Sequence, residues 1–120
     1  MSLNVLIADD SSTMRKIIVR SLLSLGANGL TEAGDGEQAV AHFKAGQFDL
    51  VLTDWNMPHK SGLEVVKEIR ADNAHVPIIM ITTEAEKSRV VEALQAGVTD
   101  YLIKPFTAET LKEKLGKYGL

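Results

Sequence analysis

The chain has 120 residues, of which 45% are hydrophobic and 24% are charged, and its formal net charge is −3. This length and composition are typical of one globular domain with a single core, not of a disordered segment, so we expect one domain over residues 1–120. The negative charge argues against a nucleic-acid-binding surface, which is usually basic. Because the chain has no cysteine, disulfides and thiolate metal sites are excluded.

The sequence also lacks the marks of membrane or export targeting. No apolar stretch reaches the roughly 18 residues of a membrane-spanning segment. The first ten residues, MSLNVLIADD, are too short and too acidic for a signal peptide. We therefore expect a soluble cytoplasmic protein that contacts no membrane.

Five short apolar runs predict β-strands, and in chain order they span residues 3–9, 29–34, 48–54, 76–82 and 100–104. The first, third and fourth are nearly continuous stretches of leucine, methionine and β-branched residues, as strands covered on both faces require. The second and fifth runs are weaker, and we predict them as strands partly from their spacing.

Between and after the strands, apolar residues recur at helical spacing and predict five amphipathic helices. Their apolar faces are formed, in chain order, by Met14, Ile17, Ile18, Leu22 and Leu25; Ala39, Val40 and Phe43; Val65, Val66 and Ile69; Val90, Val91 and Leu94; and Leu111 and Leu115. Strands that alternate with helices through short connections predict the α/β class, a parallel sheet with helices on both faces.

Several residues mark where these helices begin and end. Asp35, Ser61 and Thr83 each stand three residues before a glutamine or glutamate, which is the capping-box spacing that favours a helix start. A left-handed glycine often follows the last turn of a helix. The glycines that follow the first, second and fourth helical patterns are Gly26, Gly46 and Gly97.

Polar side chains stand where four of the predicted strands end. They are Asp9 and Asp10 on the first strand, Asp54 on the third, Thr82 on the fourth and Lys104 on the fifth. Ligands of open α/β sheets bind beyond the carboxyl ends of the strands. We therefore expect these side chains to converge on one site.

The three carboxylates of this cluster need a cation or protons. Two carboxylates ~4 Å apart repel each other by ~4 kcal/mol at an effective dielectric constant near 20. With no histidine at these strand ends and no cysteine, an all-oxygen site of this kind suits Mg²⁺. Lys104 and Thr82 could then hold a phosphoryl group. Asp54, between the acidic pair and the lysine, could be the nucleophile that accepts it.

These residues and their surroundings resemble the receiver domains of bacterial two-component response regulators. The matching segments are ADDSSTMRK (8–16), TDWNMP (53–58), ITTEA (81–85), AGVTDYLIKPF (96–106) and LKEKL (111–115), in order and at family spacing. The segments DWNMP and KPFTAETL are similar to those of single-domain chemotaxis regulators in particular. The resemblance implies a flavodoxin-like (βα)5 fold, with a five-stranded parallel sheet of order 2-1-3-4-5.

The resemblance also implies roles for the acidic residues. Asp54 would accept a phosphoryl group from a phosphohistidine on a sensor histidine kinase. Asp10 would bind Mg²⁺ directly and Asp9 would bind it through water. Asp54 and the backbone carbonyl of Asn56 would complete the protein ligands.

The remaining site residues would hold the phosphoryl group and transmit its presence. Thr82 and Lys104 would bind phosphoryl oxygens, and the Lys104–Pro105 peptide bond is expected to be cis. Tyr101 would turn inward when Thr82 moves toward the phosphoryl group, in a two-state population shift; without the family it could equally be an amphipathic residue half-buried on its strand. The change would be read on the face of the fourth helix, fifth strand and fifth helix. Candidates for that face are Val90, Tyr101, Ile103, Lys114 and Lys117.

Three residues depart from the family pattern without removing a site residue. Ser61 stands where many relatives have aspartate, and both residue types can cap a helix. Ser11 replaces an aromatic residue of the best-known chemotaxis regulators, which could alter access to the site. Thr83 occupies a position that often carries alanine or another small residue. Its extra bulk is expected to hinder the attacking water and to slow self-dephosphorylation.

The resemblance thus predicts a phosphoacceptor signalling protein, in chemotaxis or motility, that promotes only its own phosphorylation and dephosphorylation and is not an enzyme acting on other substrates. Expected partners are a sensor histidine kinase of the chemotaxis type, a flagellar motor switch protein or another output partner and, where one exists, a phosphatase. We expect a monomer. The chain stops soon after the fifth helical pattern, which favours a stand-alone regulator, although a module of a larger regulator or hybrid kinase would look the same.

Three other functions would use similar residues. A phosphatase that forms an aspartyl phosphate requires a second acid two residues after the nucleophile, as general acid, but this chain has Asn56 there. A length of 120 residues also leaves no room for a cap domain that would select the substrate. A flavodoxin-type electron carrier would need a neutral loop where this chain has the acidic DDSST (9–13), so electrostatics disfavour it. A degenerate receiver that only binds a partner is disfavoured because the acids, Thr82 and Lys104 are all present.

Overall fold

Five parallel strands form one sheet in the order β2-β1-β3-β4-β5, which confirms the predicted flavodoxin-like arrangement. The structure is a computed structural model that describes residues 3–120. Its elements are β1 Asn4–Ala8, α1 Ser12–Ser24, β2 Gly29–Ala33, α2 Gly36–Ala45, β3 Leu50–Thr53, α3 Gly62–Asp72, β4 Ile78–Thr82, α4 Lys87–Ala96, β5 Asp100–Ile103 and α5 Ala108–Gly116. Within residues 3–120, no helix combines the length and apolar character needed to cross a membrane.

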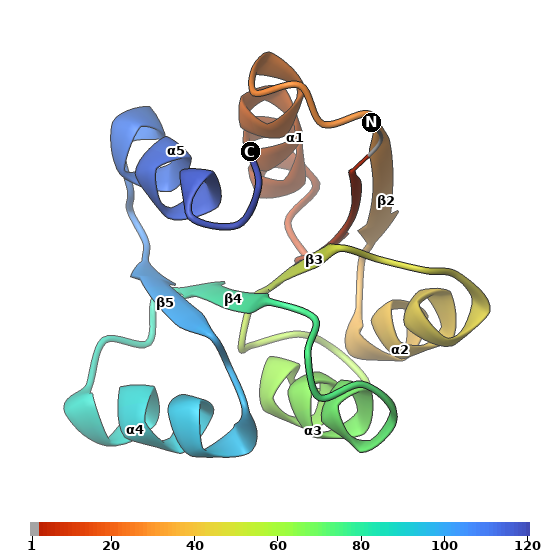
Figure 1. Ribbon diagram of the computed structural model, residues 1–120. Helices are drawn as coiled ribbons and strands as arrows, with labels where there is room; N and C mark the ends of the chain where they lie inside the picture. The colour runs from red at the N-terminus through yellow and green to blue at the C-terminus, as the bar shows by residue number, and fades with distance from the viewer. Residues whose placement is uncertain (1–2) are drawn as a thin grey trace.

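The helices cover both faces of the sheet. Figure 1 shows α1 and α5 on one face and α2, α3 and α4 on the other. Side chains alternate along β1: Val5 and Ile7 pack with α1 and α5, whereas Leu6 and Ala8 pack with the helices of the opposite face. Because both faces are covered, the central strands are apolar at nearly every position, as the sequence pattern predicts.

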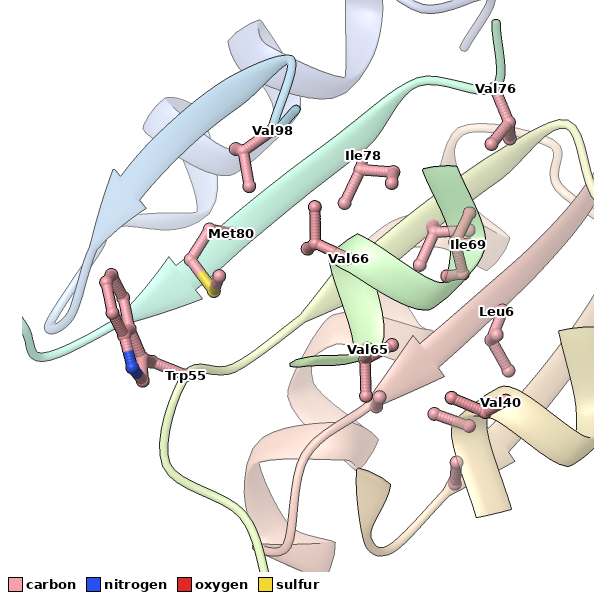
Figure 2. Close-up of a cluster of buried hydrophobic side chains, with 14 of the residues drawn as sticks. Leu6, Val40, Trp55, Val65, Val66, Ile69, Val76, Ile78, Met80 and Val98 are labelled. Atoms are coloured by element: carbon pink, nitrogen blue, oxygen red, sulfur yellow. The ribbon is translucent and has the colours of Figure 1, made fainter. Parts of the chain in front are cut away.

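The larger of the two cores lies beneath α2, α3 and α4. Figure 2 shows side chains of α3, among them Val66 and Ile69, directed toward Ile78 of β4. Trp55, which directly follows Asp54, packs in the same core close to Met80 at the carboxyl end of the sheet. Each large side chain buried in this way contributes about 1.5–3 kcal/mol. The core therefore fixes the chain next to the site.

The capping residues agree with the sequence at two helices. Asp35 accepts a hydrogen bond from the backbone N–H of Gln38 at the start of α2. Ser61 does the same for Glu64 at the start of α3. Both predicted helix starts are confirmed. The structure adds two caps that the sequence analysis missed, Ser11 for α1 and Thr107 for α5.

The predicted start at Thr83 is wrong. Helix α4 begins at Lys87, and its N-cap residue, Glu86, makes no side-chain capping bond. The preceding segment is instead held to the end of β4, because the backbone N–H of Glu84 donates to Oγ1 of Thr82 at 3.3 Å. The carbonyl of Glu84 also accepts a bond from the hydroxyl of Tyr101, so both backbone groups of Glu84 are bonded outside the helix.

All three predicted glycines lie at helix ends, but only two of them are left-handed. Gly26 and Gly97 have φ values of 95° and 114°, in the left-handed region. Gly46 is different, because its φ of −133° is extended. Its extended backbone carries the chain back so that the rings of Phe43 and Phe48 stack with centroids 6.0 Å apart. A left-handed turn at Gly46 was therefore a wrong prediction.

The apolar faces predicted for the first and fourth helices are too wide. Ile17 is 43% exposed in α1, and Val91 and Leu94 are 41% and 48% exposed in α4. Within α4, Ala93 is the residue that becomes buried. The contact between α4 and the rest of the fold is thus narrow, and it leaves apolar surface on the outer side of this helix.

We predict that Gly62→Ala lowers the free energy of unfolding by about 2–4 kcal/mol. Gly62 opens α3, and its N–H donates to the carbonyl of Trp55 at 2.7 Å. A Cβ at this position would overlap the backbone carbonyl oxygen of Asp54, so the loop would have to move. Urea unfolding measures the change.

The matched control is Gly116→Ala at the end of α5, where a Cβ would meet no atom within 4 Å. Its stability should change by no more than about 1 kcal/mol. Similar small effects at both glycines would show that the loop accommodates a side chain at position 62.

Candidate functional site

Four strands bring the predicted site residues to one edge of the sheet. Asp9 follows β1, Asp54 follows β3, Thr82 is the last residue of β4 and Lys104 follows β5. Carboxylate oxygens of Asp9, Asp10 and Asp54 all lie within 4.8 Å of one another. This spacing is close enough for one cation to contact several of them.

Lys104 joins two of these carboxylates. Its Nζ donates to Oδ2 of Asp9 at 2.7 Å and to Oδ2 of Asp54 at 3.0 Å, and its side chain is only 11% exposed. Burial by itself would lower the pKa of Lys104, but the hydrogen bonds to Asp9 and Asp54 outweigh burial, so the pKa is raised. Lys104 is therefore a charged ammonium at neutral pH. The Lys104–Pro105 peptide bond is cis, as the resemblance implies.

Asp54 is held by its neighbours in the backbone. Its N–H donates to the carbonyl of Ala8 at 2.9 Å, and its own carbonyl accepts a bond from the hydroxyl of Thr53 at 3.0 Å. Of its carboxylate oxygens, Oδ1 accepts the N–H of Trp55 at 2.6 Å, whereas Oδ2 faces Lys104. The two oxygens of Asp54 therefore have different surroundings.

The acidic pair after β1 contains one buried and one exposed side chain. Asp9 is 2% exposed, and its Oδ1 accepts the N–H of Ser11 at 2.9 Å. Its backbone N–H is bonded to the carbonyl of Ala33 at 3.1 Å. Asp10 is exposed. Asp10 is thus the carboxylate of the three that is open to an ion arriving from solvent.

The donor set of this cluster fits Mg²⁺. Mg²⁺ takes oxygen ligands, keeps several waters and is usually bound through one or two carboxylates. Asp9, Asp10 and Asp54 supply such oxygens beside an exposed edge. Asn56 is also exposed, and its Nδ2 donates to Oε1 of Glu84 at 3.1 Å.

Tyr101 connects the site with the loop before α4. The hydroxyl of Tyr101 donates to the backbone carbonyl of Glu84 at 2.6 Å, and the ring is half-buried. Burial raises the pKa of Tyr101, and the nearby carboxylates of Glu84 and Asp54 raise it further, against an opposing effect of Arg89. Since Glu84 is also bonded to Thr82, the tyrosine and the threonine hold the same loop.

The candidate residues on the α4–β5–α5 face differ in their exposure to solvent and in whether they form ion pairs. Ile103 and Lys117 are exposed and Val90 is half-buried. Nζ of Lys114 donates to Oδ1 of Asp100 at 2.7 Å, with its side chain 26% exposed. Lys114 is therefore part of an ion pair that joins α5 to the start of β5.

Asp100 is the centre of that pairing. Burial alone would raise its pKa, but hydrogen bonds from Lys114, from the N–H of Tyr101 and from the hydroxyl of Tyr118 outweigh burial, so the pKa is lowered. Asp100 consequently remains ionised at neutral pH. A charged partner that approached Lys114 would have to compete with it.

The sequence analysis missed two arginines near the site. Arg15 donates to the backbone carbonyl of Asp9. The guanidinium carbon of Arg89 lies 5.3 Å from the ring centroid of Trp55, within cation–π range. In the sequence each arginine looks like an ordinary charged residue on a helix. The partner of Arg15 is a backbone atom, and the partner of Arg89 is remote along the chain. Neither carries a signal of its own.

We predict that Lys104→Met lowers the free energy of unfolding in EDTA by about 3 kcal/mol. The variant leaves Asp9 and Asp54 close together without the ammonium that neutralises them, and removing one partner of a buried ion pair is strongly destabilising. In Mg²⁺ the loss should be smaller, because the ion restores positive charge. Urea unfolding with and without Mg²⁺ measures both values.

The pH dependence of this difference tests its origin. Because the pKa of Lys104 is raised above 10.5 in the folded state, its contribution is fully present below that pH and is lost as the pH rises through the folded pKa. The free energy of unfolding of wild type should therefore exceed that of the variant by a constant amount from pH 7 to about pH 10. The pKa values of Tyr101 and Tyr118 are also raised, mainly by burial, but both tyrosines titrate in both proteins. Equal stabilities at pH 7 would contradict the prediction.

Comparison with known proteins agrees with this geometry. Residues 5–116 match the family model of the response regulator receiver domain. Chemotaxis protein CheY-3 of Vibrio cholerae is 52% identical over 118 residues, which are 97% of this chain and 91% of the relative. Chemotaxis protein CheY of Pseudomonas aeruginosa is 46% identical over 117 residues, which are 96% of this chain and 94% of the relative.

Solved structures show the same fold. The chemotaxis response regulator CheY4 of Vibrio cholerae superposes with a TM-score of 0.91 at 34% identity, over 98% of this chain and 99% of that chain. A CheY-like receiver domain protein of Methanospirillum hungatei gives a TM-score of 0.91 at 25% identity, over 98% and 93% of the two chains. The chain therefore belongs to the response regulator receiver domain family of two-component signalling systems.

Proposed function

We propose that this chain is a phosphoacceptor switch in a two-component system, in which Mg²⁺-dependent transfer of a phosphoryl group from a phosphohistidine of a sensor histidine kinase to Asp54 controls a partner. The observation that carries the proposal is the ammonium of Lys104 between the carboxylates of Asp9 and Asp54. A phosphoryl group on Asp54 would offer that ammonium a new anion. Chemotaxis or motility is the proposed process, because relatives with 46–52% identity are named chemotaxis proteins.

The surroundings of Asp54 favour one of its oxygens as the nucleophile. Oδ1 accepts the backbone N–H of Trp55, whereas Oδ2 is bonded only to Nζ of Lys104 among the bonds found in residues 3–120. In the proposed reaction Oδ2 forms a bond to phosphorus as the P–N bond to the imidazole breaks, and the ring nitrogen keeps the electron pair. Nζ of Lys104 then binds a phosphoryl oxygen.

The acidic cluster would hold the metal for this step. Asp9, Asp10, Asp54 and the backbone carbonyl of Asn56 are the proposed protein ligands. Mg²⁺ bound there would offset the repulsion between these carboxylates and the incoming phosphoryl group and would orient that group. Repulsion between like charges opposes the transfer, and the close spacing of the acids supports the proposed need for the metal.

Thr82 and Tyr101 are the proposed switch. The hydroxyl of Thr82 would donate to a second phosphoryl oxygen, which changes its contact with the N–H of Glu84. Because the hydroxyl of Tyr101 binds the carbonyl of the same residue, the loop and the tyrosine would adjust together. Coupling of this kind is typically worth ~1–3 kcal/mol.

The proposed output surface is the α4–β5–α5 face, represented by Val90, Tyr101, Ile103, Lys114 and Lys117. Exposed apolar side chains on α4 and β5 support a protein partner there. A flagellar motor switch protein or another output partner would bind this face, and a phosphatase would reset the switch. The proposal describes a monomer and is the same for a stand-alone regulator and for a module of a larger regulator or hybrid kinase.

The decisive experiment compares wild type with Asp54→Asn. Trp55 is the only tryptophan in the chain and is adjacent to Asp54, so its fluorescence reports on the site. We predict a saturating response to Mg²⁺, followed by a second change with beryllofluoride, a phosphoryl mimic, in wild type alone. Mass spectrometry after incubation with acetyl phosphate should place a phosphoryl group on Asp54.

Two results would count against the proposal. One is the absence of Mg²⁺ and beryllofluoride binding by both fluorescence and calorimetry. The other is an equal beryllofluoride response in Asp54→Asn, which would place the acceptor elsewhere. The first outcome would leave the domain as a receiver-shaped binding module, and the second would refute Asp54 as the acceptor.

We also predict that Thr83→Ala speeds loss of the phosphoryl group by roughly 3-fold, equivalent to ~0.7 kcal/mol in the barrier. Thr83 is exposed and follows Thr82 directly, so its side chain is proposed to narrow the approach of water to the site. Removing it gives the attacking water more room. The decay of phosphorylated protein after removal of acetyl phosphate measures the rate, and equal decay in the two proteins would overturn the steric argument.

A further inference from the structure

Arg15 lies behind the acidic pair and joins two strand ends. It stands in the first turns of α1, and its Nη1 donates to the backbone carbonyl of Asp9. Its Nε donates to Oε1 of Glu32 on β2 at 3.0 Å, and its side chain is 18% exposed. A guanidinium suits this position, because its donors form a rigid fork that can serve two acceptors at once.

The carbonyl that Arg15 holds belongs to the peptide between the two acids. The side chain of Asp9 is already fixed by Lys104 and by the N–H of Ser11. Asp10 is exposed, and no side-chain hydrogen bond fixes it among residues 3–120. The direction in which Asp10 leaves the strand is therefore set by the orientation of that peptide.

The charge of Arg15 and a positioning role for it predict opposite effects on the affinity for Mg²⁺. A guanidinium beside a cation site repels the cation, so a residue acting only through its charge would weaken Mg²⁺ binding, and its removal would tighten it. A residue that orients a ligand would have the reverse effect. Partners that orient the ligands of a metal typically change its affinity by 10–100-fold.

We infer that Arg15 is a positioning residue of the metal site. Anchored by Glu32, it fixes the backbone carbonyl of Asp9 and thereby directs the carboxylate of Asp10 toward Asp9 and Asp54. The inference rests on the proposed function, because it takes this acidic cluster to be the Mg²⁺ site. Arg15 touches neither the metal nor the phosphoryl group. It acts through the peptide that carries Asp10.

The experiment measures Mg²⁺ affinity for the full chain and three variants, by calorimetry and by Trp55 fluorescence. Arg15→Met removes the donors and the charge but keeps an unbranched side chain. Arg15→Lys keeps the charge but replaces the rigid planar fork with a single ammonium. Arg20→Ala removes the same charge from an exposed position on the same helix and is the matched control.

We expect Arg15→Met to bind Mg²⁺ about 10-fold more weakly than wild type and Arg15→Lys about 3-fold more weakly, with Arg20→Ala unchanged or slightly tighter. Urea unfolding in EDTA identifies conditions in which every protein is folded, and affinities are compared there. A role in folding alone would lower stability without changing the Mg²⁺ affinity of the folded protein.

An Arg15→Met affinity equal to or tighter than that of Arg20→Ala would overturn the inference. If Arg15→Met does not fold, Arg15→Lys decides, because unchanged affinity in a variant that keeps the charge would show that the fork has no role. Failure of wild type to bind Mg²⁺ would instead refute the proposed metal site and the inference with it.

Discussion

The repulsion among three carboxylates at one edge of the sheet is the constraint on which the rest of the structure depends. A parallel sheet brings the ends of β1 and β3 together, and it therefore brings Asp9 and Asp54 together as well. The ammonium of Lys104, 2.7 Å and 3.0 Å from their oxygens, compensates this charge. The backbone N–H of Lys104 donates to the carbonyl of Thr82 at 2.9 Å, so the pairing of β4 with β5 positions the ammonium.

The same compensation makes the site responsive to ligands. A cation that approached the cluster would compete with Lys104 for the oxygens of Asp9 and Asp54, whereas an anion on Asp54 would add a new partner for the ammonium. Lys104 is bonded through its backbone to Thr82, whose hydroxyl accepts the N–H of Glu84. A change of charge at the acids is therefore connected, through a chain of bonds, to the loop that precedes α4.

Features governed by local composition or by sheet geometry could be predicted from the sequence. The strands, the alternation and the convergence of polar residues follow from apolar runs and from the rule that parallel strands end at one edge. Periodicity does not say how wide a stripe a neighbouring element covers, so Ile17 and Val91 were wrongly placed inside. Thr83 has the spacing of a helix cap, but tertiary bonds keep its segment as a loop. Arg15 was missed because it binds a backbone carbonyl, and backbone atoms leave no mark in a sequence.

Helix α4 is the element most open to influence from the site. Ala93 is its buried residue, and its N-cap residue makes no side-chain capping bond, so few contacts hold its first turn. Segments with few buried contacts open at the lowest cost in free energy. One contact near that turn is the bond from the hydroxyl of Tyr101 to the backbone carbonyl of Glu84 in the preceding loop. Another is Arg89, which lies over the ring of Trp55, and the backbone N–H of Trp55 donates to Oδ1 of Asp54. Asp54 is thus linked through Trp55 and Arg89 to the first turn of a helix that few contacts hold, and the bond from Tyr101 reaches the loop in front of the same turn.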